Sequence, residues 1–388
     1  MRILIDGGSA GSGGYVHHLR GVLTARPPAD LDVMLLCSPR LADTLGPLDE
    51  RVRVVSHPEL DDPRRAARLR WWNQRFPAVV RAAAPGVLLH PRGFVRGRAG
   101  AVPRAVVHHN IAPFCAETYR LYGMSLDSAR YLATRTAMVR GMRKAAGVAF
   151  VHEYPREVVT RQVPGIRRHT IVHNCTPTSY LDVPPAAKVE LPAQVKVLCV
   201  STQYMSKYPW NVVHGVCDAR ARTGLDLRLH MVGGGDRRTG DRLREAIRDR
   251  GAQTFVTLHD NVPEERMRAV YADADLFVFP STQECFPLTL LEAMASGLPI
   301  ACSERMAMPR ILRDAGVYFD PTDPASLGWA LGTLLADGEF RVRCGKLAQI
   351  YAREYQWQRA ADDLFGFLRT LAGPASATRS LARDGAMA

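Results

Sequence analysis

The sequence predicts an α/β protein of two Rossmann-like, doubly wound domains. At 388 residues the chain exceeds the size at which single hydrophobic cores usually stop growing, so two domains are expected. Its composition, 47% hydrophobic and 23% charged, is that of an ordinary globular protein. In both halves short apolar runs alternate with segments of helical spacing, which favours parallel sheets covered by helices.

The first domain is expected over residues 1–175. Its opening run MRILIDGG is a short apolar strand that leads directly into glycines, and the following GYVHHLRGVLTAR has helical spacing. A strand, a glycine loop and a helix together open an α/β unit. Further strands are expected in the runs LDVMLLCS, PGVLLHP, PRAVVHHN, GVAFVH and HTIVHN.

A proline-containing stretch without periodicity, residues 176–194, predicts a linker to the second domain, residues 195–352. Strands of the second domain are expected at VKVLCVS, LRLHMVG, TFVTLH, ADLFVFPS and LPIACS. Helices are expected over residues 241–249, 264–271 and 289–295. The last residues, 373–388, are small and polar and predict a disordered tail.

The eight cysteines form no CxxC pair and no short-range cluster with histidine, so neither a zinc site nor a disulfide framework is indicated. Glycines follow the first residues too soon for the apolar core of a signal peptide. No apolar run approaches the roughly 18 residues of a transmembrane helix. We therefore expect a cytoplasmic protein with free, buried thiols.

The net charge of +13 is confined to the first half of the chain. Residues 1–180 hold 26 basic and 13 acidic residues, whereas residues 181–388 hold 25 of each. This asymmetry predicts an anionic partner for the first half. Arginines and aromatic residues alternate over residues 64–84, which suits an anionic membrane surface or an acidic glycan, and equally a solvated helix that packs Trp71 and Trp72 inward.

Two glutamates, Glu284 and Glu292, stand eight positions apart in a segment that is otherwise almost uncharged. The strand ADLFVFPS ends just before Glu284, and doubly wound sheets bind ligands at the carboxyl ends of their strands. A helix that starts near Thr289 would place Glu292 in its first turn, where the helix N-terminus favours anions. The alternative is that Glu284 caps a helix and Glu292 lies on the surface.

This segment closely resembles the signature of the retaining GT-B glycosyltransferases of family 4, in which seven residues separate two glutamates and a motif A-M-A-S-G-x-P follows. The resemblance covers nearly the whole chain. It implies the GT-B fold, in which two Rossmann-like doubly wound domains face each other across a cleft, and a C-terminal helix, here residues 353–372, that crosses back to the N-terminal domain. Further matches are LHMVGGGD, MRAVYADADLFVFPS, YQWQRAADDL, DGGSAGSGGYVHHL, VVHHNIAPF and TIVHNCTP.

The resemblance implies a nucleoside-diphosphate sugar as the donor substrate and a hydroxyl acceptor bound mainly by the first domain. In the family pattern Glu292 accepts the ribose hydroxyls. The donor sugar and the diphosphate are held by Glu284 and by the backbone around Phe286, Pro287, Leu288 and Thr289.

Three further positions match the family's donor site. Lys207 matches the phosphate-binding lysine, although Ser206 and Thr202 occupy the positions where an arginine is usual. Gly13 and Gly14 match the glycines that let the backbone approach the diphosphate.

His109 matches the histidine that lies beside the donor sugar, so His109, Glu284 and Lys207 are the expected catalytic residues. Asn110 stands in place of the family's aspartate, and His108 offers a competing register. A buried structural histidine is the alternative for this position.

Two other site classes fit the sequence poorly. No G-x-G-x-x-G register exists between Gly7 and Gly21, which argues against a nicotinamide-binding fingerprint. Asp273 and Asp275 form a D-x-D pattern typical of a metal site, but they precede an apolar strand, where an aspartate caps or solvates a helix end. We expect no metal and no other cofactor.

The sequence thus predicts a metal-independent, retaining glycosyltransferase that moves a hexose-like sugar to a hydroxyl acceptor, such as an anionic or lipid-linked cell-envelope glycan. Its basic N-terminal domain would contact an anionic membrane at the cytoplasmic face, and no nucleic acid is expected as a partner. Two alternatives stay open: a tailoring enzyme for a small soluble natural product, and a non-catalytic protein that binds a sugar nucleotide.

Overall fold

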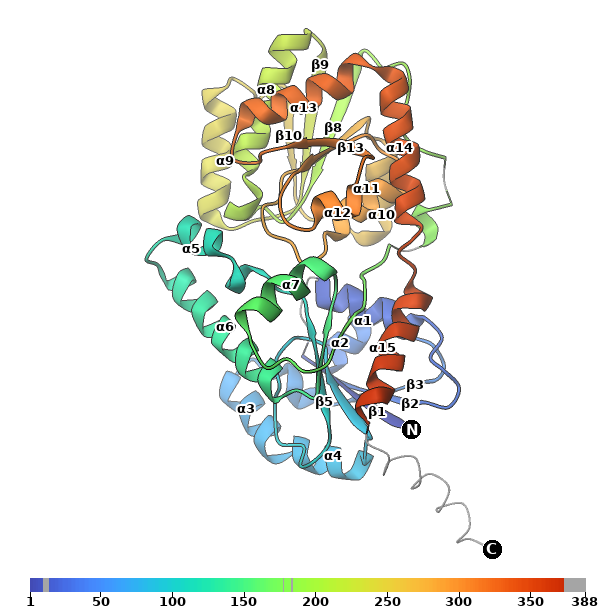
Figure 1. Ribbon diagram of the computed structural model, residues 1–388. Coiled ribbons are helices and arrows are strands. Elements are labelled where there is room, and N and C mark those ends of the chain that lie inside the picture. Colours follow the sequence, from blue (N-terminus) through green and yellow to red (C-terminus); the bar gives the residue numbers. More distant parts are fainter. Residues whose placement is uncertain (10–13, 177, 183, 373–388) are drawn as a thin grey trace, which may run out of the picture. The chain divides into compact units, whose positions relative to one another are not determined.

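The computed structural model describes residues 1–9, 14–176, 178–182 and 184–372, which form two compact units (Figure 1). Among the described residues, unit 1 contains those in the ranges 1–114, 124–175 and 356–372, and unit 2 those in the ranges 115–123 and 176–355. Residues 115–123 thus belong to unit 2, although the sequence predicts them as part of the first domain, residues 1–175. The predicted tail, residues 373–388, lies outside the described residues.

Unit 1 is built on a parallel sheet with the strand order β3-β2-β1-β4-β5-β6-β7. Its strands are β1 (Arg2–Gly8), β2 (Asp32–Cys37), β3 (Val52–Ser56), β4 (Val87–His90), β5 (Arg104–His108), β6 (Gly147–Phe150) and β7 (His169–Ile171). The central strands β4 and β6 are buried along their whole length because helices cover both faces of the sheet.

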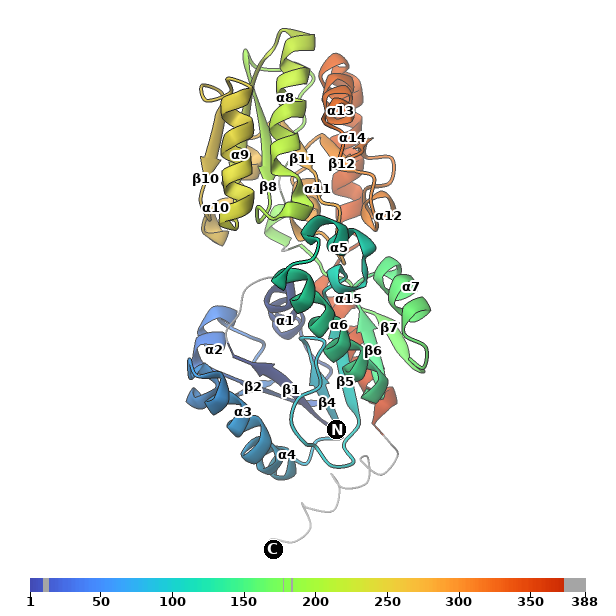
Figure 2. The same ribbon diagram turned by 90° about the vertical axis from the view of Figure 1, so that its left-hand side faces the viewer.

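The helices of unit 1 are α1 (Gly14–Thr24), α2 (Pro39–Leu45), α3 (Arg65–Gln74), α4 (Phe76–Ala83), α6 (Leu126–Lys144), α7 (Glu153–Gln162) and α15 (Trp357–Leu371), with 3-10 turns η1 (Pro58–Asp61) and η2 (Ala112–Phe114). Helices α3 and α4 pack on one face of the sheet, where Leu4, Leu36 and Leu88 point toward them. Helix α15 packs on α1 and on strands of the same sheet (Figure 2).

The tryptophans of the arginine-rich segment belong to this core. Trp71 and Trp72 are 3% and 6% exposed and pack against Phe76 beneath the sheet. Of the two predictions for residues 64–84, the inward-packing helix is confirmed. A membrane contact made by these two indoles is wrong, because folding has already buried their apolar surface.

Unit 2 is built on a second parallel sheet with the order β10-β9-β8-β11-β12-β13. Its strands are β8 (Gln194–Val200), β9 (Asp226–Val232), β10 (Val256–His259), β11 (Leu276–Phe279), β12 (Ile300–Ser303) and β13 (Gly316–Phe319). As in unit 1, the central strands β8, β11 and β12 consist mainly of buried apolar residues.

The helices of unit 2 are α5 (Ala116–Tyr122), α8 (Pro209–Thr223), α9 (Arg237–Asp249), α10 (Glu264–Ala272), α11 (Leu288–Ala295), α12 (Met308–Leu312), α13 (Pro324–Ala336) and α14 (Gly338–Ala352), with 3-10 turns η3 (Thr178–Tyr180) and η4 (Met205–Lys207). Side chains of α8, α9 and α13 form one apolar core with the sheet. Helix α11 packs against α14 (Figure 1).

Each sheet has one switch point, where consecutive βα units change from winding outward in one direction to winding in the other. It lies between β1 and β4 in unit 1 and between β8 and β11 in unit 2. In open parallel sheets the crevice outside the carboxyl ends of the strands at such a point is the usual ligand site. These two places are therefore where functional side chains are sought.

The central part of the predicted linker packs against unit 2. The backbone amides of Ala186 and Ala187 donate hydrogen bonds of 3.0 and 3.1 Å to the carbonyls of Ser296 and Gly297. All eight cysteines are free and buried, as expected. In the part of the chain that the structure describes, no helix combines the length and the apolar character needed to cross a membrane.

Candidate functional site

The switch point of unit 2 brings Lys207 and Glu284 together. Lys207 ends η4 in the loop after β8, and Glu284 lies in the loop after the neighbouring strand β11. Their side chains form an ion pair and are only 13% and 22% exposed. Lys207 Nζ also donates a hydrogen bond of 2.8 Å to Ser281 Oγ, which in turn donates one of 3.0 Å to Glu284 Oε1.

The two loops are locked to each other by main-chain contacts. The amide and the hydroxyl of Thr282 both bond to the carbonyl of Ser206, at 2.9 and 3.0 Å. Tyr208 then adopts a left-handed conformation, with φ of 42°, and Pro209 starts α8. Lys207 is thus held on a short, fixed loop rather than on a flexible surface segment.

Glu292 is half-buried on α11 and is held by a tyrosine that the sequence does not single out. The hydroxyl of Tyr271, a fully buried residue on α10, donates a hydrogen bond of 2.7 Å to Glu292 Oε2. Burial raises the pKa of Glu292 to about 7, against the lowering effect of this hydrogen bond. Since α11 begins at Leu288, one residue earlier than expected, Glu292 is its fifth residue and lies at the start of the second turn instead of in the first.

The N-terminus of α11 follows Glu284 after three residues. Pro287 precedes the first helical residue and supplies no side-chain cap, so the amides of Leu288 and Thr289 have no side-chain acceptor among the described residues. Phe286 packs edge-on against Tyr355, with 5.1 Å between the ring centroids. This anchors the entry to the helix, and the helix dipole adds a partial positive charge at the same strand end.

A glycine turn after β9 lies against the loop that carries Lys207. A Cβ atom on Gly235 would stand 2.2 Å from the carbonyl oxygen of Gln203, so only glycine fits there. Gln203 and Gly235 also form an isolated parallel bridge. The backbones of the loops that follow β8 and β9 therefore lie in close contact.

Residues 115–123 supply a further contact that the sequence does not predict. Thr118, fully buried, donates a hydrogen bond of 2.9 Å from Oγ1 to Gln283 Oε1, next to Glu284. Helix α5 also packs on η4, which ends at Lys207. Only the fold reveals this contact, because the two partners are 165 positions apart in the chain.

The expected site residues of unit 1 lie around α1 and β5. Gly14 is the first residue of α1, and Gly13 lies outside the described residues. His108 is fully buried at the end of β5 between the rings of Phe114 and Phe150, and burial lowers its pKa to about 3. His108 therefore acts as a core residue.

His109 stands just beyond β5 and faces a second histidine. Its ring lies 4.9 Å from that of His18 on α1, and burial holds the pKa of His109 well below its usual range. His18 Nδ1 pairs with Asn174 Oδ1 at 2.8 Å. No described residue bonds to Nε2 of either histidine. Both rings are thus neutral at pH 7 and each keeps one nitrogen for a ligand.

The D-x-D pattern is engaged elsewhere. Asp275 accepts hydrogen bonds from Lys188 Nζ at 2.8 Å and from the amide of Lys196 at 2.9 Å. Asp273 pairs with Lys196 Nζ at 2.7 Å. These contacts lie at the amino end of β11, opposite the edge that carries Glu284, and give both carboxylates a structural role.

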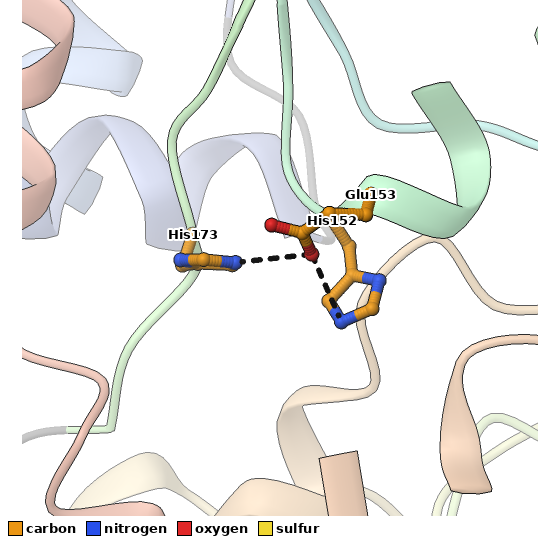
Figure 3. A group of neighbouring side chains, drawn as sticks. All are labelled: His152, Glu153 and His173. Atoms are coloured by element: carbon orange, nitrogen blue, oxygen red, sulfur yellow. Dashed lines mark ion pairs between the residues drawn. The ribbon is translucent and has the colours of Figure 1, made fainter. Parts of the chain in front are cut away.

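Among the described residues, one group has metal-binding side chains close together: His152, Glu153 and His173 (Figure 3). Glu153 Oε2 lies 3.4 Å from His152 Nε2 and 3.6 Å from His173 Nε2. His152 Nδ1 accepts the amide proton of Tyr154 at 3.1 Å, so the proton of the neutral ring sits on Nε2. That nitrogen directs a proton, not a lone pair, toward Glu153. Hydrogen bonding from His173 lowers the pKa of Glu153 to about 2, which fits a carboxylate paired with two imidazoles.

Comparison with known proteins finds a similarity to one family over most of unit 2. Residues 195–337 match the family described as glycosyl transferases group 1. A D-inositol 3-phosphate glycosyltransferase of Corynebacterium efficiens is 32% identical over 163 residues, 41% of this chain and 38% of that protein. O-antigen chain mannosyltransferase B of Escherichia coli is 25% identical over 261 residues, 64% of this chain and 66% of that protein. The chain thus spans 38% to 66% of the length of these curated relatives.

Solved structures share the fold over nearly the whole chain. Sucrose-phosphate synthase from Thermosynechococcus elongatus has a TM-score of 0.72 at 17% identity and covers 95% of this chain and 98% of its own. HepE of Anabaena, solved in complex with UDP-glucose, has a TM-score of 0.70 at 17% identity and covers 95% and 100%. The predicted fold class, GT-B with two Rossmann-like units, is confirmed.

Proposed function

We propose that this chain, which has the GT-B fold and is similar to the group 1 glycosyl transferases over residues 195–337, transfers a sugar from a nucleoside diphosphate to a hydroxyl acceptor. The observation that carries the proposal is the joining of Lys207 and Glu284 at the switch point of unit 2, inside the matched segment. Glu292 and the N-terminus of α11 follow at the same strand end. Together these groups offer one ligand hydrogen-bond acceptors for its hydroxyl groups and hydrogen-bond donors for its anionic oxygens.

The chemistry of these groups fits a sugar nucleotide. A departing diphosphate gains negative charge in the transition state, and a fixed cation with backbone amides stabilises that charge. Lys207 is such a cation, and the first-turn amides of α11 are such donors. Glu292, held by Tyr271, is positioned to accept the hydroxyls of a ribose. Relatives and neighbours named as glycosyltransferases, and the UDP-glucose complex of HepE, support this assignment.

The reaction is proposed to proceed with retention of configuration and without a metal ion. His109, which is neutral, and Glu284, which is paired with Lys207, are proposed to contact the sugar ring, and we assign neither of them the role of a covalent nucleophile. Positive charge for the diphosphate comes from Lys207 and the helix, and the pair Asp273 and Asp275 is engaged by lysines. In the mechanism of the family, the diphosphate leaves from the same face of the sugar at which the acceptor hydroxyl enters.

The acceptor is proposed to be anionic and to bind mainly to unit 1, because the positive charge excess of the chain lies there. A cell-envelope glycan or its lipid-linked precursor has this chemistry. The eight free, buried thiols suit the reducing cytoplasm in which we place the protein. Peripheral contact with an anionic membrane would rest on the arginines of unit 1 alone, since Trp71 and Trp72 are buried.

A two-step experiment tests this function. Thermal-shift screening of UDP, GDP, ADP and their sugars should identify a nucleotide that raises the melting temperature, because a ligand bound only by the native state stabilises it. Release of the nucleoside diphosphate from the matching sugar donor should then be measured with and without EDTA. We expect turnover that survives the chelator and that drops strongly in Glu284→Gln, while Glu339→Gln, an exposed glutamate on α14, behaves like the wild type.

Other outcomes would select the alternatives. Nucleotide binding without donor turnover under any condition would make the chain a non-catalytic sugar-nucleotide-binding protein. Turnover lost in EDTA and restored by manganese would contradict the metal-independent mechanism. Efficient transfer to small neutral alcohols would favour a tailoring enzyme with a soluble acceptor.

A further inference from the structure

The switch point of unit 1 contains a buried acid–base pair. Asp6 ends the apolar part of β1, and His90 ends the neighbouring strand β4. His90 Nδ1 lies 2.8 Å from Asp6 Oδ2, and the two side chains are 1% and 5% exposed. No described residue bonds to the other carboxylate oxygen or to His90 Nε2. One carboxylate is therefore fixed beneath the strand ends, with one of its oxygens already used.

Two arginines from the segment after β4 converge above this pair. A Cβ atom on Gly8 would lie 3.7 Å from Arg96 Nη1, 3.9 Å from Arg92 Nη1 and 3.8 Å from Asp6 Oδ1. The Arg92 guanidinium also stacks 4.7 Å from the centroid of the Tyr15 ring. Gly8 itself has φ of 68°, so a side chain at this point would be strained, and apart from its chain neighbours no described atom comes closer than 3.7 Å to the place of its Cβ.

The hydrophobic core fixes the position of Arg96. The next residue, Gly97, has φ of 62°, and a Cβ atom on it would lie 2.3 Å from the ring of Phe76. The Arg96 guanidinium lies 5.7 Å from the centroid of the Trp72 ring. The aromatic residues of α3 and α4 thus clamp the segment. This precise support is needed to preorganise a binding site and is not needed for a solvated arginine.

The charges in this group do not balance. Neither Arg92 nor Arg96 forms an ion pair with any residue that the structure describes, although both are half-buried. Burial lowers the pKa of Arg96, and the nearby charge of Arg92 acts in the same direction, while Asp6 opposes both. Holding two like charges close together away from water costs free energy. A bound anion would offset that cost.

We propose that Arg92 and Arg96 bind an oxyanion, a phosphate or a carboxylate, that the sugar acceptor carries. The inference rests on the proposed function, which supplies the acceptor. Guanidinium groups match both anions through paired N–H donors. The place is the switch point of the unit that carries the charge excess, and the Tyr15 hydroxyl and Arg92 Nη1 both donate to the carbonyl of Ser9, at 3.3 and 3.5 Å. The diphosphate of the donor is the other source of the same chemistry, and the experiment separates the two.

The test uses the full chain, with inorganic phosphate and acetate as probes in an inert buffer. Phosphate or acetate should raise the melting temperature of the wild type and of Arg98→Gln, an exposed arginine of the same segment. The double variant Arg92→Gln/Arg96→Gln should lose roughly 10- to 100-fold in affinity for the responding anion. Arg92→Lys/Arg96→Lys should regain part of it, because it restores charge without the planar fork. The relative response to the two probes tells a phosphate site from a carboxylate site.

The second arm measures binding of the nucleotide found by screening. The glutamine double variant should bind it as tightly as the wild type does. A parallel loss of nucleotide and anion binding would overturn the proposal and assign the arginines to the donor diphosphate. Equal anion binding in the wild type and the double variant would also overturn it. A chain that binds the anion through Arg92 and Arg96 but no nucleotide would refute the proposed function and leave the anion site standing.

Discussion

At the scale of single residues, the charged form of the buried Glu292 carboxyl group lowers the stability of the fold but favours the binding of a ligand. Burial raises its pKa to about 7, so a proton is half bound near neutral pH in the nucleotide-free protein. Ribose hydroxyls would favour the charged form by donating hydrogen bonds to it. The energetic cost of burying Glu292 is therefore recovered when the ligand binds, which is how a binding residue differs from one that only supports the fold.

The pH dependence of stability follows from this raised pKa. The folded state holds a proton on Glu292 between its ordinary pKa of 4.5 and about 7, where the unfolded chain has lost it. Stability from this group is complete below pH 4.5 and is lost as the pH rises through 7, by up to about 3 kcal/mol. Denaturation at pH 5 and pH 8 should therefore show a smaller difference in unfolding free energy for Glu292→Gln than for the wild type.

The same substitution should weaken nucleotide binding. Glu292→Gln removes a charge-assisted hydrogen bond, so the dissociation constant should rise roughly 10- to 100-fold at pH 8. In the wild type, affinity should increase from pH 6 to pH 8 as Glu292 ionises, and the variant should lack this increase. Calorimetric titration at the two pH values checks both, and equal affinities would remove Glu292 from the ribose site.

Lys207 is expected to act on the transition state. Lys207→Gln keeps hydrogen-bonding capacity toward Ser281 and Glu284 but removes the charge. Turnover should fall by roughly 10²- to 10³-fold, as for a lost donor to a developing anion, with a much smaller change in melting temperature. Lys196→Gln is the matched control, because Lys196 pairs with Asp273 at the other end of β8. If both variants lose activity alike, the effect belongs to the fold.

How far the sequence predicts these residues depends on whether their partners are close along the chain. The signature around Glu284 and Glu292 is local, and Lys207 stands beside its own family motif. Tyr271, Thr118 and the pairing of His18 with Asn174 depend on contacts between distant segments. No periodicity or spacing in the sequence carries such contacts, so only the fold reveals them.

At the scale of elements, the buried strands are predicted, and so are the edge strands β7 and β10, whereas the other two edge strands are missed. The runs expected to be strands include the whole of β1, β2, β4 and β5, because these are continuous apolar segments. Neither β3 nor β13 is anticipated, and both lie at sheet edges. Strand β3 is mostly exposed and carries an arginine, so it lacks the pattern by which strands are recognised.

The contact between α1 and α15 gives a prediction at this scale. A Cβ atom on Gly21 would lie 2.2 Å from the ring of Trp357, so the helices touch through glycine. Gly21→Ala should lower the unfolding free energy by about 1–3 kcal/mol through overpacking. Gly366→Ala, on α15 with nothing within 4 Å of its added Cβ, should instead stabilise by about 0.5–1 kcal/mol. Urea denaturation measures both, and like signs would refute the contact.

At the scale of the whole molecule, the uneven charge separates two binding tasks. Residues 181–388 carry no net charge, and the groups proposed to bind the donor are few, short-range and partly buried. Residues 1–180 carry the entire excess of +13, much of it on exposed side chains. Salt screens exposed charges over about 10 Å at 0.1 M but acts weakly on buried contacts. The two tasks should therefore differ in their response to ionic strength.

This difference supports the last prediction, on contact with anionic surfaces. Binding to vesicles that contain an anionic lipid should fall steeply between 50 mM and roughly 500 mM salt, while nucleotide affinity changes little. The triple variant Arg70→Gln/Arg75→Gln/Arg81→Gln, on or beside α3 and α4, should lower vesicle binding at low salt, because these arginines are exposed and form no ion pair with the described residues. Arg237→Gln/Arg244→Gln on α9 should not. Replacing Trp71 should destabilise unit 1 instead, since its indole is already buried. If vesicle binding changes neither with salt nor in the triple variant, the positive charge has no role at a membrane. A small soluble acceptor bound at Arg92 and Arg96 would then be the better explanation of the charge excess.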